Sequence, residues 1–341
     1  MTNSSGVSPL LTLPSIEVDL SRVEAALRDA VRTEDDYLTE LASHLIVAGG
    51  KRLRPVVAMA SAQTGRAGVG DGLSDGASDK VTDDVVQGAV SVELVHLGSL
   101  YHDDVMDEAD TRRGVETVNA KWGNLQAILA GDFLLSRASE IAASLGTEIA
   151  GLLAHTIGQL CYGQIGELRR TYSTTRTERE YLDSISGKTA SLFATAARIG
   201  ALVGGLERPE VEALTGYGHA FGMVFQIVDD VLDLTATEAQ LGKPAGHDII
   251  EGVYTLPVIR TLAAGGAAAG ELRDLLGRPL DAVECDKALA IVRSGGAVAE
   301  ALAVGARYVA EAESACAVLR AGLAVDALRS APGALLAVAS G

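Results

Sequence analysis

The chain has 341 residues, of which 48% are hydrophobic but only 4% are aromatic. Ala, Leu, Val and Ile therefore supply the apolar content, which favours packed helices over sheets, where β-branched and aromatic side chains concentrate. The formal net charge of −17 argues against nucleic-acid binding, because such binding needs Lys and Arg to displace counterions. The three cysteines are isolated and odd in number, which excludes a disulfide framework or a zinc ribbon and predicts a cytoplasmic protein.

The predicted elements, taken in chain order, are nearly all helices. Residues 1–15 are small, polar and proline-containing, and we expect them to form a flexible tail. Helical spacing of apolar residues then begins, and a Gly/Asp/Ser-rich stretch at residues 65–80 predicts a flexible loop. Helical periodicity resumes after this loop and continues, with short glycine breaks, through the C-terminal third. Because no composition shift marks a boundary, the sequence predicts one all-α domain over residues 16–341, built as a single large helical bundle.

The longest uncharged run, residues 149–166, has the length of a membrane span. It carries His155, Gln159 and Gln164 at helical spacing, so we expect a buried helix of a soluble protein there instead. The N-terminus has no basic segment followed by a continuous apolar one, so no signal peptide is predicted.

Asp103, Asp104 and Asp107 form a DDxxD motif. On a helix, Asp103 and Asp107 lie one turn apart on the same face. Like charges at that spacing repel and weaken the helix, so a cation is expected beside them unless the face is open to solvent. Solvated acidic turns are common, and this motif alone leaves both interpretations open.

Asp229, Asp230 and Asp233 form a second DDxxD motif inside an apolar segment, residues 225–234. Because Phe, Ile, Val and Leu flank them, we expect three buried acids rather than a solvated face. Buried carboxylates are costly unless they are paired or bind a metal. Mg²⁺ takes one or two protein carboxylates and completes its shell with water and substrate phosphates. Two acidic clusters facing one cavity therefore predict a Mg²⁺–diphosphate complex as the ligand.

Basic residues gather near the acidic motifs and beside glycines, although the chain as a whole is acidic. They are Lys51 and Arg54, Arg112 and Arg113, and Lys188. Guanidinium forks match phosphate oxygens, so this pattern predicts anion binding. Taken alone, the residues of segment 51–54 could equally cap a helix or pair with surface acids. His96 lies two turns before the first motif; a lone histidine is more often a satisfied core residue, but beside phosphate sites it can donate to a diphosphate.

Six segments occur in a fixed order: GGKRLRP (49–55), ELVHLGSLYHDDVMDEADTRRG (93–114), GDFLLSRA (131–138), GKTASLF (187–193), FQIVDDVLD (225–233) and GKPAGHD (242–248). Together they resemble the trans-isoprenyl diphosphate synthases, also called the polyprenyl synthetase family. The resemblance covers roughly residues 23–320. It implies an all-α fold of packed helices around a deep central cavity, usually as a homodimer.

The resemblance also implies roles for individual residues. The aspartates of both motifs would hold two to three Mg²⁺ ions on the allylic diphosphate: Asp103, Asp104, Asp107, Asp229, Asp230 and Asp233. The residues that would contact the allylic substrate are Arg112, Lys188, Thr189 and Gln226. Those that would bind isopentenyl diphosphate are Lys51, Arg54, His96 and Arg113. The residues expected to act on the reacting groups are Asp103, Asp107, Lys188, Thr189, Gln226 and Asp229.

One departure from the family pattern concerns the segment EGVYTLP (251–257). Val253 stands where the family often has Lys, so one cationic contact to the diphosphate is absent. Lys188 and Lys243 are then expected to supply the remaining positive charge.

The expected reaction is ionisation, condensation and elimination. Breaking the allylic C–O bond builds charge on a leaving diphosphate and leaves a carbocation, which needs a dry apolar chamber. Lone pairs of Thr189 and Gln226 can face that cation, and the released diphosphate can take the final proton. The partners are isopentenyl diphosphate, an allylic prenyl diphosphate and a second copy of the chain. The apolar product predicts peripheral membrane contact without an encoded anchor.

Product length depends on the depth of the cavity. Gly98 and Ser99 lie just before the first motif, where relatives with short products carry a bulky aromatic side chain. We therefore expect an open path and a long-chain product of the hexaprenyl-to-decaprenyl class, typical of a quinone side chain. A shorter-chain enzyme such as a geranylgeranyl diphosphate synthase stays open, with its floor set by another helix. So does a non-catalytic partner subunit, although such subunits usually lose one aspartate motif.

Overall fold

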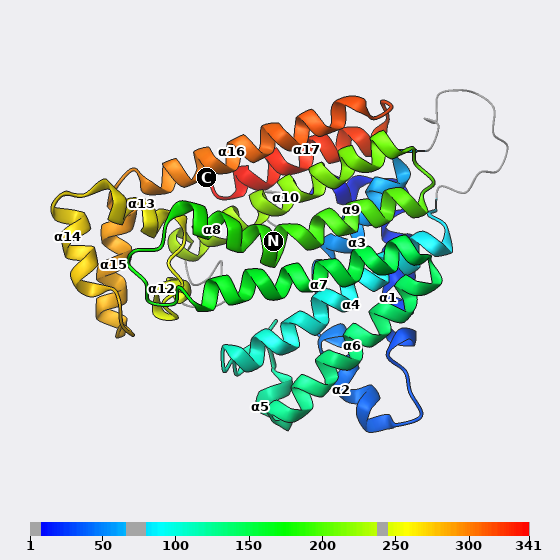
Figure 1. Cartoon of the computed structure of the whole chain (residues 1–341), viewed down its shortest axis with the longest axis horizontal. Helices are drawn as coiled ribbons and strands as arrows, with labels where there is room; N and C mark the ends of the chain where they lie inside the picture. The colour runs from blue at the N-terminus through cyan, green and yellow to red at the C-terminus, as the bar shows by residue number, and fades with distance from the viewer. Residues whose placement is uncertain (1–7, 66–79, 237–244, 341) are drawn as a thin grey trace, which may run out of the picture.

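A computed structural model describes residues 8–65, 80–236 and 245–340. Within these ranges the chain is helical apart from one short two-stranded hairpin, which confirms the all-α prediction (Figure 1). The first half contains η1 (Pro9–Thr12), α1 (Ile16–Ala30), α2 (Asp36–Val47), α3 (Leu53–Gln63), α4 (Asp83–Met106), β1 (Thr111–Arg112), β2 (Val115–Glu116), α5 (Val118–Trp122), α6 (Asn124–Ser144) and α7 (Thr147–Leu168). The second half contains α8 (Glu178–Ile185), η2 (Ser186–Ala190), α9 (Ser191–Val203), α10 (Arg208–Thr235), α12 (His247–Ile250), α13 (Leu256–Ala264), α14 (Gly266–Leu275), α15 (Ala282–Ser294), α16 (Ala297–Ala315), η3 (Cys316–Val318) and α17 (Leu323–Val338).

The two long helices α4 and α10 carry the acidic motifs and form the centre of the bundle. α4 packs against α3, α6 and α9, and α10 packs against α9, α16 and η2. Both are apolar on most of their circumference, which is typical of helices buried on all sides. Pro209 stands in the first turn of α10, where its missing N–H costs nothing. Each motif therefore lies at the C-terminal end of a helix held rigidly by its neighbours.

Residues 9–15 are not the flexible tail that their composition predicts. η1 packs on α3 and α17, and Leu10 and Leu13 are buried in the main core. The prediction rested on the polar residues and missed these two leucines, whose burial orders the segment. Residues 1–7 and 66–79, which include nearly all of the predicted loop, lie outside the described residues.

The end of the bundle at the left of Figure 1 has an apolar cluster of its own, formed by α12 to α15 together with Leu234 at the end of α10. Ile249, Tyr254 and Leu289 are among its buried members. This cluster supports residues 245–255, which turn back towards α10. It thereby fixes one wall of the site described below.

Among the described residues, no single helix is both long and apolar enough to cross a bilayer. Ala282–Ser294 and Ala297–Val318 reach that limit only as a pair, with a bend of 65° between them. The uncharged run 149–166 lies in α7, and the expectation that it is a buried helix is only half right. Its inner face is buried, but Tyr162 and Ile165 on the outer face are 78% and 56% exposed.

Candidate active site

The first acidic motif lies where α4 ends. Asp103 is half-buried, Asp104 is buried, and Asp107 is the exposed residue that caps the helix. The Arg112 side chain donates to the Asp104 carboxylate. Burial raises the pKa of Asp103 to about 6, with the neighbouring Asp107 carboxylate adding to the effect and Lys188 opposing it. Asp104 is therefore already paired with an arginine, whereas Asp107 lines the cavity described below and Asp103 lies near Lys188.

The hairpin after α4 carries Arg112 and Arg113, whose side chains have different partners. Thr111 pairs with Glu116, and the two residues at its tip are Arg113 and Gly114, both with a positive φ of 54° and 77°. A two-residue turn of this hand matches the twist of paired strands. Arg113 reaches back to the carbonyl of Gly49 and leaves no room for a side chain at Gly50, whose Cβ would lie 2.8 Å from the Arg113 Cζ. Gly50 of the GGKRLRP segment thus lies directly against this arginine.

The second acidic motif is organised around Asp230. Its carboxylate accepts from the Tyr181 hydroxyl at 2.5 Å and from the Gln226 amide at 2.8 Å. The other side of the Gln226 amide accepts from the Thr189 hydroxyl at 2.7 Å. Burial raises the pKa of Asp230 to about 7, and these two donors only partly oppose the effect. The chain Thr189–Gln226–Asp230 therefore holds its carboxylate in one orientation.

The expectation that all three aspartates of this motif are buried is wrong for one of them. Asp233 is buried and accepts from the backbone N–H of Asp248 at 3.2 Å. Asp229, in contrast, is exposed. Successive residues of a helix point about 100° apart, so Asp229 and Asp230 cannot share one face. The flanking apolar residues pack on the sides of α10 away from Asp229.

Lys188 lies in η2, a π-helical turn between α8 and α9. Such turns are frequent at functional sites because they re-aim a side chain within a helix. Gly163 of α7 allows η2 to approach closely, since a Cβ there would lie 2.4 Å from the Lys188 backbone nitrogen. The Lys188 ammonium pairs with the Glu167 carboxylate at 2.6 Å. Burial alone would lower the pKa of Lys188, but Glu167 and then Asp103 outweigh it and the net pKa is raised.

Both acidic motifs reach one cavity of about 140 Å³, which we call the acidic pocket. Its lining includes Asp107 from α4, Glu167 from α7, Lys188 from η2, and Gln226 and Asp230 from α10. Among the described residues, no three His, Cys, Asp or Glu side chains come together as a ready-made metal site. Mg²⁺ that arrives with a diphosphate needs few protein carboxylates, because water and phosphate oxygens complete its shell.

A second charged group lies beside the first motif, and we call Arg54, His96 and Arg113 the basic cluster. Burial lowers the pKa of Arg54 to about 10, with Glu93 opposing and Arg113 adding to the effect. Burial and then the nearby Arg54 and Arg113 hold the pKa of His96 well below its usual range, so its imidazole is neutral. The buried Nε of Arg54 has no hydrogen-bond partner in the part of the chain that the structure describes. An anion bound at the basic cluster would therefore relieve the repulsion between Arg54 and Arg113.

Arg52 of the same segment has a structural role. It is buried and donates to Glu24 at 2.6 Å, to Glu93 at 3.0 Å and to the carbonyl of Ile46 at 3.0 Å. Glu93 is therefore shared between its ion pair with Arg52 and the nearby Arg54 and Arg113, and it compensates the charge of the basic cluster only in part. Lys51, in contrast, is exposed. The GGKRLRP segment thus divides into a buried anchor and residues that can reach a ligand.

The structure changes the expectation for Gly98. A Cβ at this position would lie 3.0 Å from the Gly131 carbonyl oxygen and 3.2 Å from the Leu135 Cγ, both on α6. Gly98 therefore allows α4 and α6 to pack closely and does not itself border an open path. Ser99 is half-buried and its hydroxyl donates to the His96 carbonyl at 2.8 Å. Lys243 lies outside the described residues.

The polar side chains of the acidic pocket that sequence reasoning missed include Glu167, Arg176 and Tyr181, and also His247, Asp248 and Glu251. Glu167 is the first charged residue after the uncharged run, four residues beyond Gly163, and that spacing was its only signal. Tyr181 and Arg176 carry no local pattern, because their role depends on how α8 and the preceding segment fold over α10.

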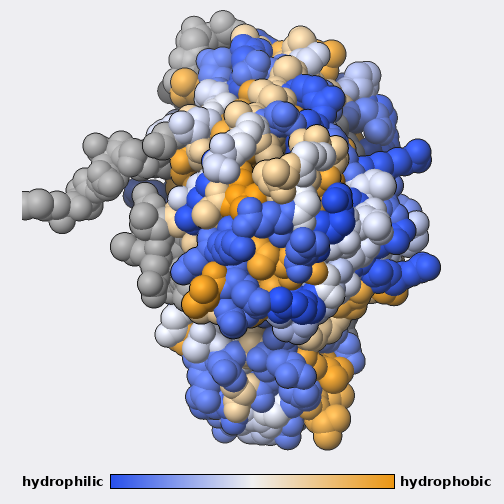
Figure 2. Space-filling view, turned by 90° about the vertical axis from the view of Figure 1, so that its left-hand side faces the viewer, coloured by the Kyte–Doolittle hydropathy of each residue, from blue (hydrophilic) through white to orange (hydrophobic). Residues whose placement is uncertain are grey.

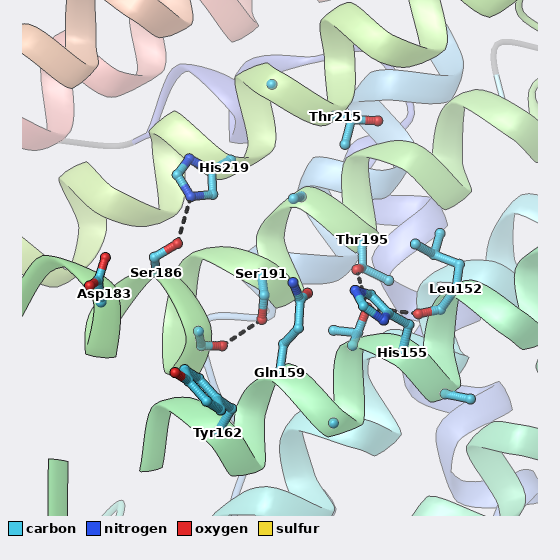
Figure 3. A pocket seen from close by; sticks show the side chains of 16 residues that line it. Leu152, His155, Gln159, Tyr162, Asp183, Ser186, Ser191, Thr195, Thr215 and His219 are labelled. Atoms are coloured by element: carbon cyan, nitrogen blue, oxygen red, sulfur yellow. Dashed lines mark hydrogen bonds between the residues drawn. The ribbon is translucent and has the colours of Figure 1, made fainter. Parts of the chain in front are cut away.

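A larger cavity of about 920 Å³ lies on the outer side of α7 (Figure 3). His155, Gln159 and Tyr162 border it from α7, and His219 faces it from α10, where its ring bonds to Ser186 at 2.9 Å. No aspartate of either motif lines it. Cavity volume alone would therefore have indicated this cavity, and not the acidic pocket, as the active site.

Comparison with known proteins adds the family. The chain is 40% identical over 306 residues to a nonaprenyl diphosphate synthase of Mycobacterium tuberculosis, covering 89% of this chain and 88% of that protein. It is 42% identical over 252 residues to a geranylgeranyl diphosphate synthase of Methanosarcina mazei, covering 72% and 74%. Its fold matches a polyprenyl synthase of Caulobacter crescentus, crystallised with calcium and isoprenyl diphosphate, with a TM-score of 0.87 at 32% identity, covering 98% and 99%. The polyprenyl synthetase model matches residues 35–292, so the chain belongs to the polyprenyl synthetase family and is a prenyltransferase.

Proposed function

We propose that this enzyme condenses isopentenyl diphosphate head-to-tail with an allylic prenyl diphosphate, in a Mg²⁺-dependent reaction, and makes a long-chain all-trans polyprenyl diphosphate. The observation that carries the proposal is the meeting of both acidic motifs at one pocket that also contains Lys188. The basic cluster lies beside this pocket, next to the first motif. The chain thus offers two anion sites of different chemistry for two diphosphates.

The donor set of the acidic pocket fits Mg²⁺ carried by a diphosphate. Burial raises the pKa of Asp103 to about 6 and of Asp230 to about 7, so both carboxylates gain from a nearby cation. Asp103, Asp107 and Asp230 would hold the ions from opposite helices, with Asp229 at the exposed edge. When bound, Mg²⁺ supplies positive charge that stabilises the departing diphosphate.

The chain's own residues would orient the allylic substrate and protect the cation. Lys188 would donate to the leaving diphosphate, and Arg112 would hold Asp104 in place beside it. The lone pairs of Thr189 and Gln226, fixed by their mutual hydrogen bond, would face the allylic cation without attacking it. The new C–C bond then forms to isopentenyl diphosphate, and the released diphosphate takes the proton that is lost. No protein base is needed.

The basic cluster would bind isopentenyl diphosphate without metal. Arg54 and Arg113 stay charged at neutral pH, whereas the neutral His96 ring can donate one N–H. Lys51 lies exposed at the edge and would close over the anion. These roles follow from charge and from position beside the first motif.

Product sizing tests the proposed chain length. Purified enzyme is incubated with isopentenyl and farnesyl diphosphates and Mg²⁺, and the products are measured by mass spectrometry. We expect hexaprenyl to decaprenyl products. A C20 product alone would favour the geranylgeranyl alternative, which the Methanosarcina relative supports. No Mg²⁺-dependent product at all would favour a non-catalytic partner subunit.

We also propose that the enzyme acts as a homodimer in the cytoplasm and touches the membrane only to release its product. The support is an apolar patch on the neighbouring helices α6 and α7, made of Leu125, Ile128, Leu129, Tyr162, Ile165 and Leu168, each at least 40% exposed. Apolar side chains are visible in Figure 2 along the lower edge of the molecule, at the height of α5 and α6. An exposed patch of this kind typically marks an interface. Light scattering of the wild type and of Leu129→Glu tests it: a monomeric wild type would contradict the dimer.

A further inference from the structure

Arg176 is a buried arginine that forms no salt bridge with any of the described residues. It precedes α8 and is only 5% exposed. One terminal nitrogen donates to the carbonyl of Tyr254 at 3.2 Å. Its Nε and its other terminal nitrogen are buried and find no acceptor within the described ranges. A guanidinium carries five N–H donors and stays charged, so this arrangement is costly unless a ligand completes it.

The position of Arg176 shows which ligand that would be. Arg176 lines the acidic pocket together with Lys188, Asp230 and Val253. Its guanidinium lies 5.6 Å from the centre of the Tyr181 ring, and the Tyr181 hydroxyl donates to Asp230. The arginine therefore reaches the pocket beside the wall formed by residues 252–255.

The pocket needs a second cation because its first is already engaged. Lys188 pairs with Glu167 at 2.6 Å, and Asp103 and Asp107 also lie near it. Val253 on the same wall as Arg176 contributes no charge. Among the described residues of the pocket, Arg176 is therefore a cation whose donors are not all taken. A guanidinium can bind two phosphate oxygens at once.

We propose that Arg176 binds the diphosphate of the allylic substrate and donates its two free N–H groups to phosphate oxygens. This rests on the proposed function, since it names a further contact of the same site. Arg176 thus supplies, from the segment before α8, the positive charge that position 253 lacks.

The test compares Arg176→Met with the wild type by titration calorimetry, with inorganic pyrophosphate as the probe in the presence of Mg²⁺. We expect about tenfold weaker binding, because a charge-assisted contact is lost. In steady-state kinetics the KM for the allylic substrate should rise by a similar factor, and the KM for isopentenyl diphosphate should not change. Arg176→Lys keeps the positive charge but loses the planar, two-pronged guanidinium, so its pyrophosphate affinity should lie between those of the wild type and Arg176→Met.

Arg260→Met is the matched control. Arg260 anchors α8 from α13 by pairing with Glu178 at 2.9 Å and with Glu300 at 3.0 Å, and it is absent from the lining of the pocket. Its loss should lower the melting temperature but leave pyrophosphate affinity within twofold. A loss of affinity in both variants would show that Arg176 acts only through the packing of α8.

A rescue separates charge from structure. Val253→Lys in the Arg176→Met background returns a cation to the same wall but cannot restore the bond to Tyr254. Recovery of pyrophosphate affinity without recovery of the melting temperature supports the proposal. Unchanged affinity in Arg176→Met, or no recovery in the double variant, overturns it. Should Arg176→Met fail to fold, the pyrophosphate affinity of Arg176→Lys decides: weaker binding than in the wild type supports the proposal, and unchanged binding overturns it. If the wild type itself binds no pyrophosphate with Mg²⁺, the proposed function fails instead.

Discussion

The acidic pocket and the basic cluster lie close together on α4 but solve the binding of an anion in opposite ways. In the basic cluster, Arg54 and Arg113 lie beside a neutral His96, and the Glu93 carboxylate, which attracts both arginines, is itself paired with Arg52. In the acidic pocket, Lys188 is paired with Glu167, and Asp103 and Asp230 have pKa values shifted towards neutrality by burial. One region is ready for a diphosphate, whereas the other must first receive cations.

This difference teaches how one enzyme could keep two similar substrates apart. Both carry a diphosphate, so shape at the charged end cannot distinguish them. Dependence on metal can, because only the site where the C–O bond breaks needs the extra positive charge.

Asp103→Asn should give the largest loss. It removes a half-buried carboxylate of the first motif, close to Lys188, while keeping the size of the side chain. We expect kcat to fall by roughly 10²–10³-fold, the usual cost of losing one group that stabilises developing charge. Incorporation of labelled isopentenyl diphosphate measures it. Asp84→Asn, at the exposed start of the same helix, is the control and should retain full activity. Equal activity of both variants would contradict the metal site.

Arg113→Gln should weaken only the metal-free site. The KM for isopentenyl diphosphate should rise by roughly 10- to 150-fold, since a charged hydrogen bond to phosphate is worth about 1.5–3 kcal/mol. The Mg²⁺ concentration for half-maximal rate should stay the same. A shift in the Mg²⁺ requirement would show that the two regions are not separate.

Acid should weaken the two sites unequally. Because the folded pKa values of Asp103 and Asp230 are about 6 and 7, these groups gain protons as the pH falls below 7 and then compete with Mg²⁺. Calorimetry from pH 8 to pH 6 should show Mg²⁺-dependent pyrophosphate binding weakening by about tenfold per unit at most. Isopentenyl diphosphate binding should change less, because the arginines stay charged throughout.

The same shifts set the sign of the stability change in the metal-free protein. The folded state binds more protons than the unfolded state between the ordinary aspartate pKa near 4 and the raised values, so stability falls as the pH rises through that window. The melting temperature without Mg²⁺ should therefore be lower at pH 8 than at pH 6. Added Mg²⁺ and pyrophosphate should reverse that order.

The smallest expected effect distinguishes two neighbours on α4. Ser99 lies one turn before Asp103 on the same face, so Ser99→Phe should shorten the product, measured by mass spectrometry. Gly98→Ala should leave product length unchanged and lower the melting temperature by a few degrees, because its Cβ would meet Gly131 and Leu135 of α6. A shorter product from Gly98→Ala would place the path over Gly98 after all.

Local patterns were enough to predict the helices and the motif residues. Helical spacing and low aromatic content predict the bundle, and the paired aspartates with the neighbouring arginines predict an anion site before any fold is known. The patterns could not separate Arg52 from Arg54, since only packing against Glu93 makes one of them structural. They also predicted burial for Asp229, because apolar neighbours do not reveal which side of a helix faces the opening.

Residues whose role depends on distant contacts were out of reach of sequence reasoning. Arg176 and Tyr181 meet Asp230 only because the segment before α8 lies against residues 252–255. Leu10 orders the chain start because α17, at the far end of the sequence, covers it. Such contacts leave no periodic trace in either segment.

The ion pair between Lys188 and Glu167 has a consequence for selectivity in a cell crowded with phosphate esters. Glu167 occupies the ammonium in advance, so any incoming anion must displace a carboxylate that is already in place. A weak, singly charged competitor gains too little from that exchange to stay. A diphosphate that arrives with its own cations can bind both members of the pair at once, because its oxygens meet Lys188 and its cations meet Glu167. The ion pair thereby disfavours the binding of other phosphate esters to the empty pocket.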